Sequence, residues 1–243
     1  MAVPAPDRNA LRLLGQRTRP LTEARERVLE VAEPLAPLLP QGGLRRGSTV
    51  ATSGPGGRAL ALALVGAATE AGSWLAVVGV PGLGLLAGAE LGVHLERVVL
   101  VAQPEPKAWS TVVASLLDAF ELVMVRPTHR ITPTDQRRLG ARARDRGSVL
   151  VQAGGSPGVW AEVPDLVASV VSSAWRGLGP GHGHLQARRV TVEVGGRRAA
   201  ARPRRAELWL PGPDGRLAAV ADPVATPVAV PDLVTPTPLL EVS

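Results

Sequence analysis

Residues 42–64, GGLRRGSTVATSGPGGRALALAL, contain the pattern that decides the fold. Ser48–Ser53 has the composition of a short strand, and the Gly-Pro-Gly-Gly run at 54–57 predicts a tight turn. The segment from Arg58 to Ala71 is apolar nearly all round, as a buried helix is. A strand, a glycine-rich turn and a buried helix in this order indicate the first unit of an α/β domain.

The same alternation of strand and helix continues toward the C-terminus. Trp74–Val80 (WLAVVGV) is a continuous apolar run, which is typical of a parallel strand covered on both faces. We further expect helices at 84–91, 107–119 and 134–146, and strands at 97–102, 122–125, 148–152 and 165–171. This alternation predicts an α/β fold in three layers with a mostly parallel sheet.

Four regions follow from these patterns. We expect residues 1–40 to form an N-terminal arm with a helix from Glu23 to Val31, because prolines from Pro34 onward end any helix. The α/β core spans residues 41–180. We expect residues 181–222 to form a small C-terminal β segment, in which Gln186–Val194 and Arg204–Leu210 pair as antiparallel strands. Residues 223–243 are rich in Pro, Val and Thr, which predicts a disordered tail.

Composition narrows the chemistry. The 243 residues include no cysteine, which removes disulfides, thiol catalysis and thiolate metal sites, and we expect neither a metal nor a cofactor. The net charge is +6, and Lys107 is the only lysine. This balance is consistent with a nucleic-acid partner or simply with the composition of a GC-rich genome. The first 20 residues lack the apolar core of a secretory signal, so we expect a cytoplasmic protein with no membrane partner.

The glycine-rich turn occupies the place of a phosphate loop. In the motif G-x-x-x-x-G-K-[ST], backbone N–H groups cradle phosphates, the lysine reaches the terminal phosphates and the hydroxyl holds magnesium. Here Gly54, Gly56 and Gly57 remain, but the turn is about two residues short. Arg58 stands at the lysine position and Ala59 at the hydroxyl position. The motif is therefore a degenerate phosphate loop.

The surrounding sequence resembles the RecA recombinase family over residues 41–175. In that family a Gly-Leu-x-x-Gly segment leads into the first strand, the phosphate loop and a long helix, as GLRRG at 43–47 does here. LGVHLERVVLVAQP at 91–104 is the most specific piece, and FELVMVRP at 120–127 follows at a similar distance. The resemblance implies a RecA-like core.

The departures from the family pattern concern the hydrolytic groups. The family has an acidic pair after the second strand, where this chain has Val80-Pro81-Gly82, and a magnesium-linked Asp after the next core strand, where it has Arg126. Phosphoryl transfer depends on positioning and charge neutralisation by such groups, so their loss predicts a protein that is not an enzyme. Arg58 and the N–H groups of the turn retain the chemistry to hold an anion.

A RecA-like core with degenerate motifs and a β-rich C-terminus resembles the ImuA group. These are accessory proteins of DNA-damage-induced mutagenesis, related to RecA and to the division inhibitor SulA, and RRVTVEVGGRRAAARPRRAELWLP at 188–211 is similar to their C-terminal β segment. The resemblance implies a non-catalytic adaptor in translesion synthesis, associated with the nucleoid during the damage response. Its implied partner is ImuB, an inactive Y-family polymerase homologue, and through ImuB an error-prone replicative-type polymerase.

Two alternatives stay open. The first hypothesis is a SulA-like inhibitor of cell division. The second is a recombination accessory that binds DNA directly. For the second alternative, clustered arginines neutralise phosphates without reading sequence, and the C-terminal β segment has few acids to oppose them. The candidate DNA contacts are Arg188, Arg189, Arg197, Arg198, Arg202, Arg204 and Arg205.

Overall fold

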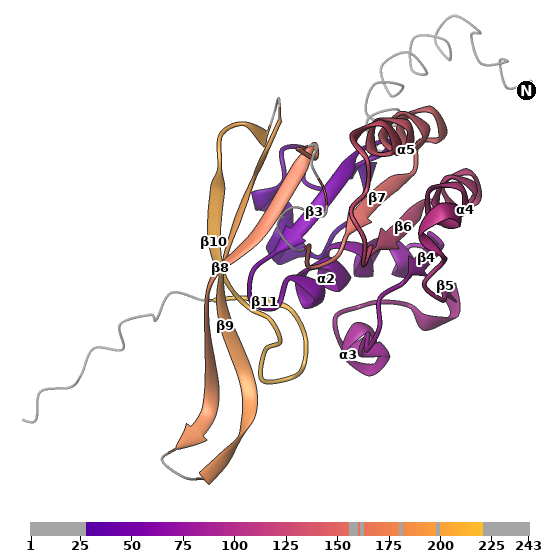
Figure 1. Ribbon diagram of the computed structural model, residues 1–243. Coiled ribbons are helices and arrows are strands. Elements are labelled where there is room, and N and C mark those ends of the chain that lie inside the picture. Colours follow the sequence, from indigo (N-terminus) through magenta and orange to yellow (C-terminus); the bar gives the residue numbers. More distant parts are fainter. Residues whose placement is uncertain (1–27, 156–159, 161–162, 180–181, 198–199, 221–243) are drawn as a thin grey trace, which may run out of the picture.

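Figure 1 shows the computed structural model, which describes residues 28–155, 160, 163–179, 182–197 and 200–220. Its elements lie within about two residues of the predicted ranges throughout the first part of the core. In chain order, these elements are β3 (Thr49–Ser53), α2 (Gly57–Glu70), β4 (Leu75–Val78), α3 (Leu85–Glu90), η2 (Leu95–Arg97), β5 (Val98–Val101), α4 (Pro106–Ala119), β6 (Leu122–Val125), α5 (Pro133–Arg146) and β7 (Val149–Gln152).

One large sheet runs through the described residues. The C-terminal strands β8 (Leu166–Gly179), β9 (His182–Gly196), β10 (Arg204–Trp209) and β11 (Ala218–Ala219) join the core strands in the order β11-β10-β9-β8-β3-β7-β6-β4-β5. All strands from β8 to β5 are parallel, while β9, β10 and β11 alternate in direction. The predicted mostly parallel sheet with an antiparallel C-terminal part is confirmed.

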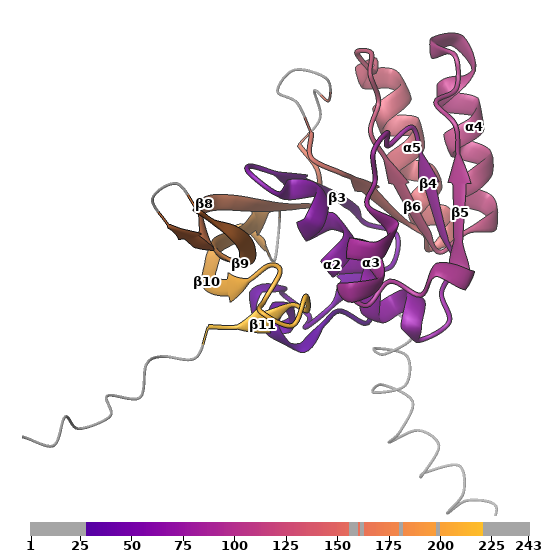
Figure 2. The same cartoon turned by 90° about the horizontal axis from the view of Figure 1, so that it is seen from below.

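Helices cover both faces of the parallel strands, which confirms the three layers (Figure 2). Successive residues of a strand point to opposite faces, and β6 shows the result. Met124 is buried in the same core cluster as Leu64 of α2, whereas Val123 belongs to the cluster that contains Trp109 of α4 and Leu139 of α5. Within the described ranges, every helix is too short or too polar to cross a membrane.

The segment before the core differs from its prediction. Where a helix was expected up to Val31, β1 (Val28–Leu29) pairs with β2 (Leu44–Arg45), and a 3-10 helix, η1 (Glu33–Leu38), lies between them. The prediction of a helix is therefore wrong for residues 28–31, the part of it that the structure describes. Leu29 is 4% exposed in the core beside α2, so burial and strand pairing decide its conformation. The predicted arm at 1–27 lies outside the described residues.

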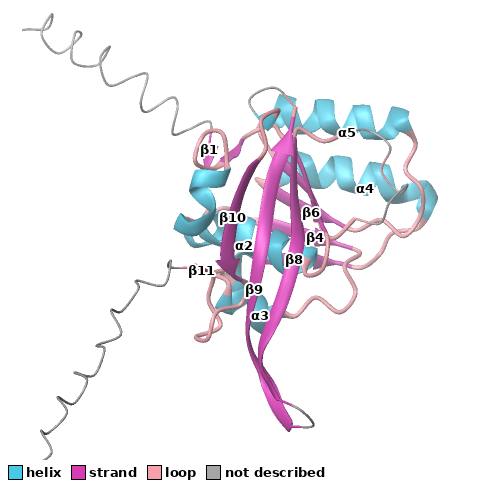
Figure 3. Cartoon of the chain, turned by 90° about the vertical axis from the view of Figure 1, so that its left-hand side faces the viewer, coloured by secondary structure: helices cyan, strands magenta, loops and turns pink. Residues whose placement is uncertain are grey.

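The strands β8 and β9 form a long antiparallel hairpin whose outer part extends beyond the rest of the sheet (Figure 3). We call residues 171–179 and 182–187 the hairpin arm. The sequence predicts the start of β8 but not its continuation to Gly179. The predicted pairing of β9 with β10 is confirmed, since Val192 lies opposite Ala206. The predicted boundary after residue 180 falls in the turn of this hairpin, and the predicted tail at 223–243 lies outside the described residues.

Candidate functional site

The Gly54–Gly57 turn connects β3 to α2 at the carboxyl ends of the parallel strands. Gly54 and Gly56 have φ angles of 82° and 91°, a region that favours glycine. A Cβ atom on Gly54 would lie 2.1 Å from the carbonyl oxygen of Val170 in β8. Backbone conformation and lack of space therefore require these glycines in the turn, independently of any phosphate.

The guanidinium group of Arg188, which comes from β9, lies against this turn. A Cβ on Gly56 would be 2.3 Å from its Nη2 and 2.4 Å from its Nη1. Its Nε donates a hydrogen bond of 2.7 Å to the carbonyl oxygen of Leu210, and the group lies 5.2 Å from the centroid of the Trp175 ring. Arg188 is only 8% exposed, and this burial lowers the pKa of its guanidinium.

The position of Arg188 differs from the surface role that the sequence suggests for it. Its neighbours in the sequence are arginines and β-branched residues, which indicate a strand but not its location. The turn that Arg188 contacts lies far away in the chain, so no local spacing signals the contact. The structure therefore adds Arg188 and Trp175 to the residues around the degenerate phosphate loop.

Arg58, at the lysine position of the loop motif, reaches in the opposite direction, toward β4. Its Nη1 donates a hydrogen bond of 3.3 Å to the carbonyl oxygen of Pro81. Ala59, at the hydroxyl position, packs against the apolar core instead of facing a ligand. The side chain of Arg58 is exposed, so it remains reachable from solvent.

The hydrolytic positions of the family carry no carboxylate in this chain. Val80 and Pro81 follow β4, and Arg126 follows β6, where its N–H group donates to the carbonyl oxygen of Val78 at 3.2 Å. Gln152, at the end of β7, is a polar residue that is only 7% exposed. It also lies at the carboxyl ends of the strands, and the motifs in the sequence do not indicate it. No group of three or more His, Asp or Glu side chains that could hold a metal ion occurs in the described ranges.

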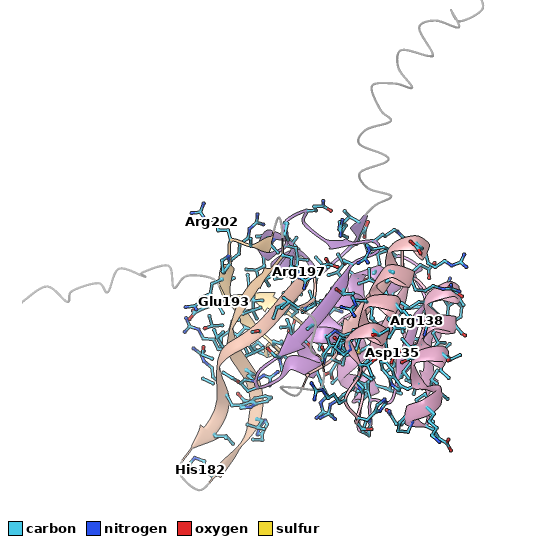
Figure 4. All side chains as sticks on the ribbon, turned by 45° about the horizontal axis from the view of Figure 1, so that its top comes forward. Asp135, Arg138, His182, Glu193, Arg197 and Arg202 are labelled. Carbon is cyan, nitrogen blue, oxygen red and sulfur yellow. The ribbon has the colours of Figure 1, made fainter. Side chains whose placement is uncertain are left out.

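Two of the predicted DNA contacts form ion pairs on the C-terminal strands, and Figure 4 labels Glu193, one of the acids. Arg189 pairs with Glu207, and Arg205 pairs with Glu193. These residues lie opposite or diagonal to one another on β9 and β10, where cross-strand charges of opposite sign attract. The acids reduce the positive charge that these two arginines offer to a phosphate backbone.

The other predicted DNA contacts have different surroundings. Nη1 of Arg204 donates hydrogen bonds of 3.1 and 2.8 Å to two main-chain oxygens in and just after η1, so this side chain ties β10 to the N-terminal segment. Arg197 lines a cavity of about 140 Å³ near the amino-terminal ends of β3 and β8, whereas the glycine turn lies at the carboxyl ends of the strands. Arg202 is exposed, and Arg198 lies outside the described residues. Direct DNA binding by this set of arginines stays a prediction.

The fold defines the class of this protein. The crystal structure of the RadB recombinase matches it with a TM-score of 0.52 at 16% sequence identity, covering 78% of this chain and 97% of RadB. At this identity the match shows a shared RecA-like fold, and it agrees with the β3–turn–α2 unit and the parallel sheet described above.

Comparison of the sequence assigns the chain to a family. Residues 37–161 match the family described as the MT3502 N-terminal domain, and the chain belongs to this family. The uncharacterized protein Rv3395c of Mycobacterium tuberculosis is 34% identical over 149 residues, which are 58% of this chain and 71% of that protein. The family match includes the degenerate phosphate loop and ends before the β8–β9 hairpin.

Proposed function

We propose that this protein is a non-catalytic accessory factor of DNA recombination and repair. More specifically, we propose an adaptor in DNA-damage-induced mutagenesis that docks an inactive Y-family polymerase homologue of the ImuB type. The RecA-like fold supports the first part, and the resemblance of the sequence to the ImuA group supports the second.

The state of the nucleotide site carries the non-catalytic part of this proposal. Arg58 replaces the lysine and donates to the carbonyl oxygen of Pro81, Ala59 replaces the hydroxyl, and Arg126 replaces the magnesium-linked acid. Removing one positioned group of this kind costs on the order of 10²- to 10³-fold in rate. Several such losses in one site leave no useful hydrolysis, even allowing for non-additivity.

An ATPase assay tests this part. We expect the purified protein to release no phosphate from ATP and magnesium above the no-protein blank, with or without single-stranded DNA. A RecA recombinase assayed beside it shows that the conditions support turnover. Magnesium-dependent hydrolysis that the substitution Arg58→Ala abolishes would contradict the proposal, because it would assign catalysis to this site.

The hairpin arm supports the adaptor part, because it offers a surface for a protein partner. Trp175, Leu178 and Leu185 are 42%, 62% and 51% exposed on it. Residues 166–192 contain no Asp or Glu, and the one arginine of the arm, Arg176, lies over the ring of Trp209. A polymerase homologue with an apolar face is complementary to this surface, and the absence of acids between residues 166 and 192 adds no repulsion toward an acidic rim on that partner.

Co-purification from the native cells after DNA damage tests the docking surface. We expect the tagged protein to recover an ImuB-type homologue and the double variant Leu178→Ser/Leu185→Ser to lose it. Leu86→Ser is the matched control, since Leu86 on α3 is 75% exposed and lies away from the arm. Equal recovery by all three proteins would remove the arm from the proposal, and recovery of DNA without any polymerase homologue would favour the direct DNA-binding alternative.

A further inference from the structure

The outer edge of β10 carries main-chain groups that pair with no other described residue. β11 covers only the end of this edge, where Ala218 lies opposite Trp209. The N–H of Leu210, the residue after β10, donates to the carbonyl oxygen of a β9 residue. Because successive residues of a strand direct their main-chain groups to opposite sides, even-numbered residues of β10 face β9 and odd-numbered ones face outward. The N–H and C=O groups of Arg205 therefore point to the open edge.

The direction and register of β11 carry the chain along this edge. The N–H of Val220 donates to the carbonyl oxygen of Glu207 over 3.2 Å, one step beyond the paired residues. Because the two strands are antiparallel, each later residue lies opposite an earlier residue of β10. The same register places Asp222 opposite Arg205, which pairs with Glu193 across its other side. Opposite charges on neighbouring strands attract each other.

Residues 221–231, which lie outside the described part of the chain, have the sequence of a strand that pairs on one side only. Prolines recur at every fourth position, so in an extended strand their missing N–H groups all lie on one side. The register directs this side away from β10, where a proline is tolerated. The positions that face the other way are all β-branched, as strands favour: Val224, Thr226, Val228 and Val230.

The cavity of about 140 Å³ lies at the end of this path. Nη1 of Arg204, at the start of β10, donates to the carbonyl oxygen that precedes Pro40, and Pro40 lines the cavity. The buried side chains of Leu44 and Leu166 form part of its wall. Residues 224–231 extend by up to ~26 Å past Arg204, far enough for a valine to enter a hollow that holds a small apolar group.

We propose that residues 221–231 continue β11 along the outer edge of β10 and place a valine side chain in this cavity. Residues 221–243 contain three acids and no basic residue, whereas arginines lie on β10 and in the cavity wall, so the charges are complementary. Composition alone predicts disorder from residue 223 onward, but it does not include the effect of an open strand edge nearby. The docked segment shields an edge that other chains would otherwise pair with. Its docking does not depend on a partner at the hairpin arm.

Hydrogen exchange of the whole ¹⁵N-labelled protein, followed by nuclear magnetic resonance, tests the strand. We expect the N–H of Arg205 to exchange slowly and Asp222→Pro to accelerate it by at least about tenfold, because the proline removes an N–H group that faces β10. Ala221→Pro is the matched control, since the N–H it removes faces outward, and it should leave the rate unchanged. The N–H of Ala206, which faces β9, reports that each variant is folded. Rapid exchange of Arg205 in the unaltered protein overturns the proposal.

Two further results identify the occupant. Equal protection of Arg205 in the unaltered protein and in Asp222→Pro also overturns the proposal, because something else then covers the edge, and its loss on dilution would identify a second copy of the chain. For the cavity, we expect nuclear Overhauser contacts between the methyl groups of Leu44 and those of a valine at 224, 228 or 230. Absence of these contacts overturns the placement of a valine in the cavity.

Discussion

At the scale of single residues, the glycines of the 54–57 turn have two physical explanations. In the sequence they indicate a phosphate loop, where glycine lets the backbone approach an anion. In the structure Gly54 meets the main chain of Val170, and Gly56 meets the guanidinium of Arg188. Packing alone therefore explains why these two positions carry glycine, with no bound phosphate required.

The cost of a side chain at Gly54 is a testable consequence. Gly82 also has a positive φ, 64°, but a Cβ there would have no atom within 4 Å, so Gly82→Ala reports backbone strain alone, about 1–2 kcal/mol. Gly54→Ala adds a collision with a carbonyl oxygen, and we expect it to lower the free energy of unfolding by a further 1–3 kcal/mol or so. Urea denaturation followed by tryptophan fluorescence measures both. If Gly54→Ala and Gly82→Ala lower the free energy of unfolding equally, β8 moves away from the added methyl group at no cost.

At the scale of elements, α4 and α5 are joined by an ion-pair network on their exposed side. Asp118 of α4 pairs with Arg142 and Arg146 of α5, and Nε of Arg146 donates to it over 3.0 Å. The sequence predicts both helices, but it does not show which acid faces the basic residues of α5. The hydrogen bond from Arg142, together with the nearby positive charges, lowers the pKa of Asp118 below its ordinary value.

This lowered pKa predicts a pH dependence of stability. The folded protein binds a proton at Asp118 less readily than the unfolded chain does, so the stabilisation is fully present above the unfolded pKa and is lost as the pH falls through the folded pKa. We expect the Tm difference between the unaltered protein and Asp118→Asn to be constant near neutral pH and to shrink below about pH 4. Glu70→Gln, at the exposed end of α2, is the control. A difference that persists in acid would exclude the ion pairs as its cause.

At the scale of the whole molecule, the sequence predicts the parallel core well and the surroundings of the site poorly. Runs such as Leu75–Val78 and Leu122–Val125 are apolar at every position, which only strands buried on both faces require. Val28 and Leu29 lie at the end of a helical pattern, but pairing with β2 decides their structure. The place of Arg188 depends on how β8 and β9 cross the end of α2, a tertiary relation that no local pattern encodes.

The position of β3 in the middle of the sheet has a consequence for synthesis on the ribosome. β3 leaves the ribosome before every other strand of the large sheet in the described chain, yet its two neighbours are β7 and β8. The hydrogen bond from the N–H of Thr49 to Asp165 spans 116 residues. Contacts of such sequence separation form slowly, so β3 and the turn after it wait with unpaired edges while most of the chain is translated. Codon choice and chaperone access over residues 54–165 therefore bear directly on how much of the nascent chain reaches the native sheet.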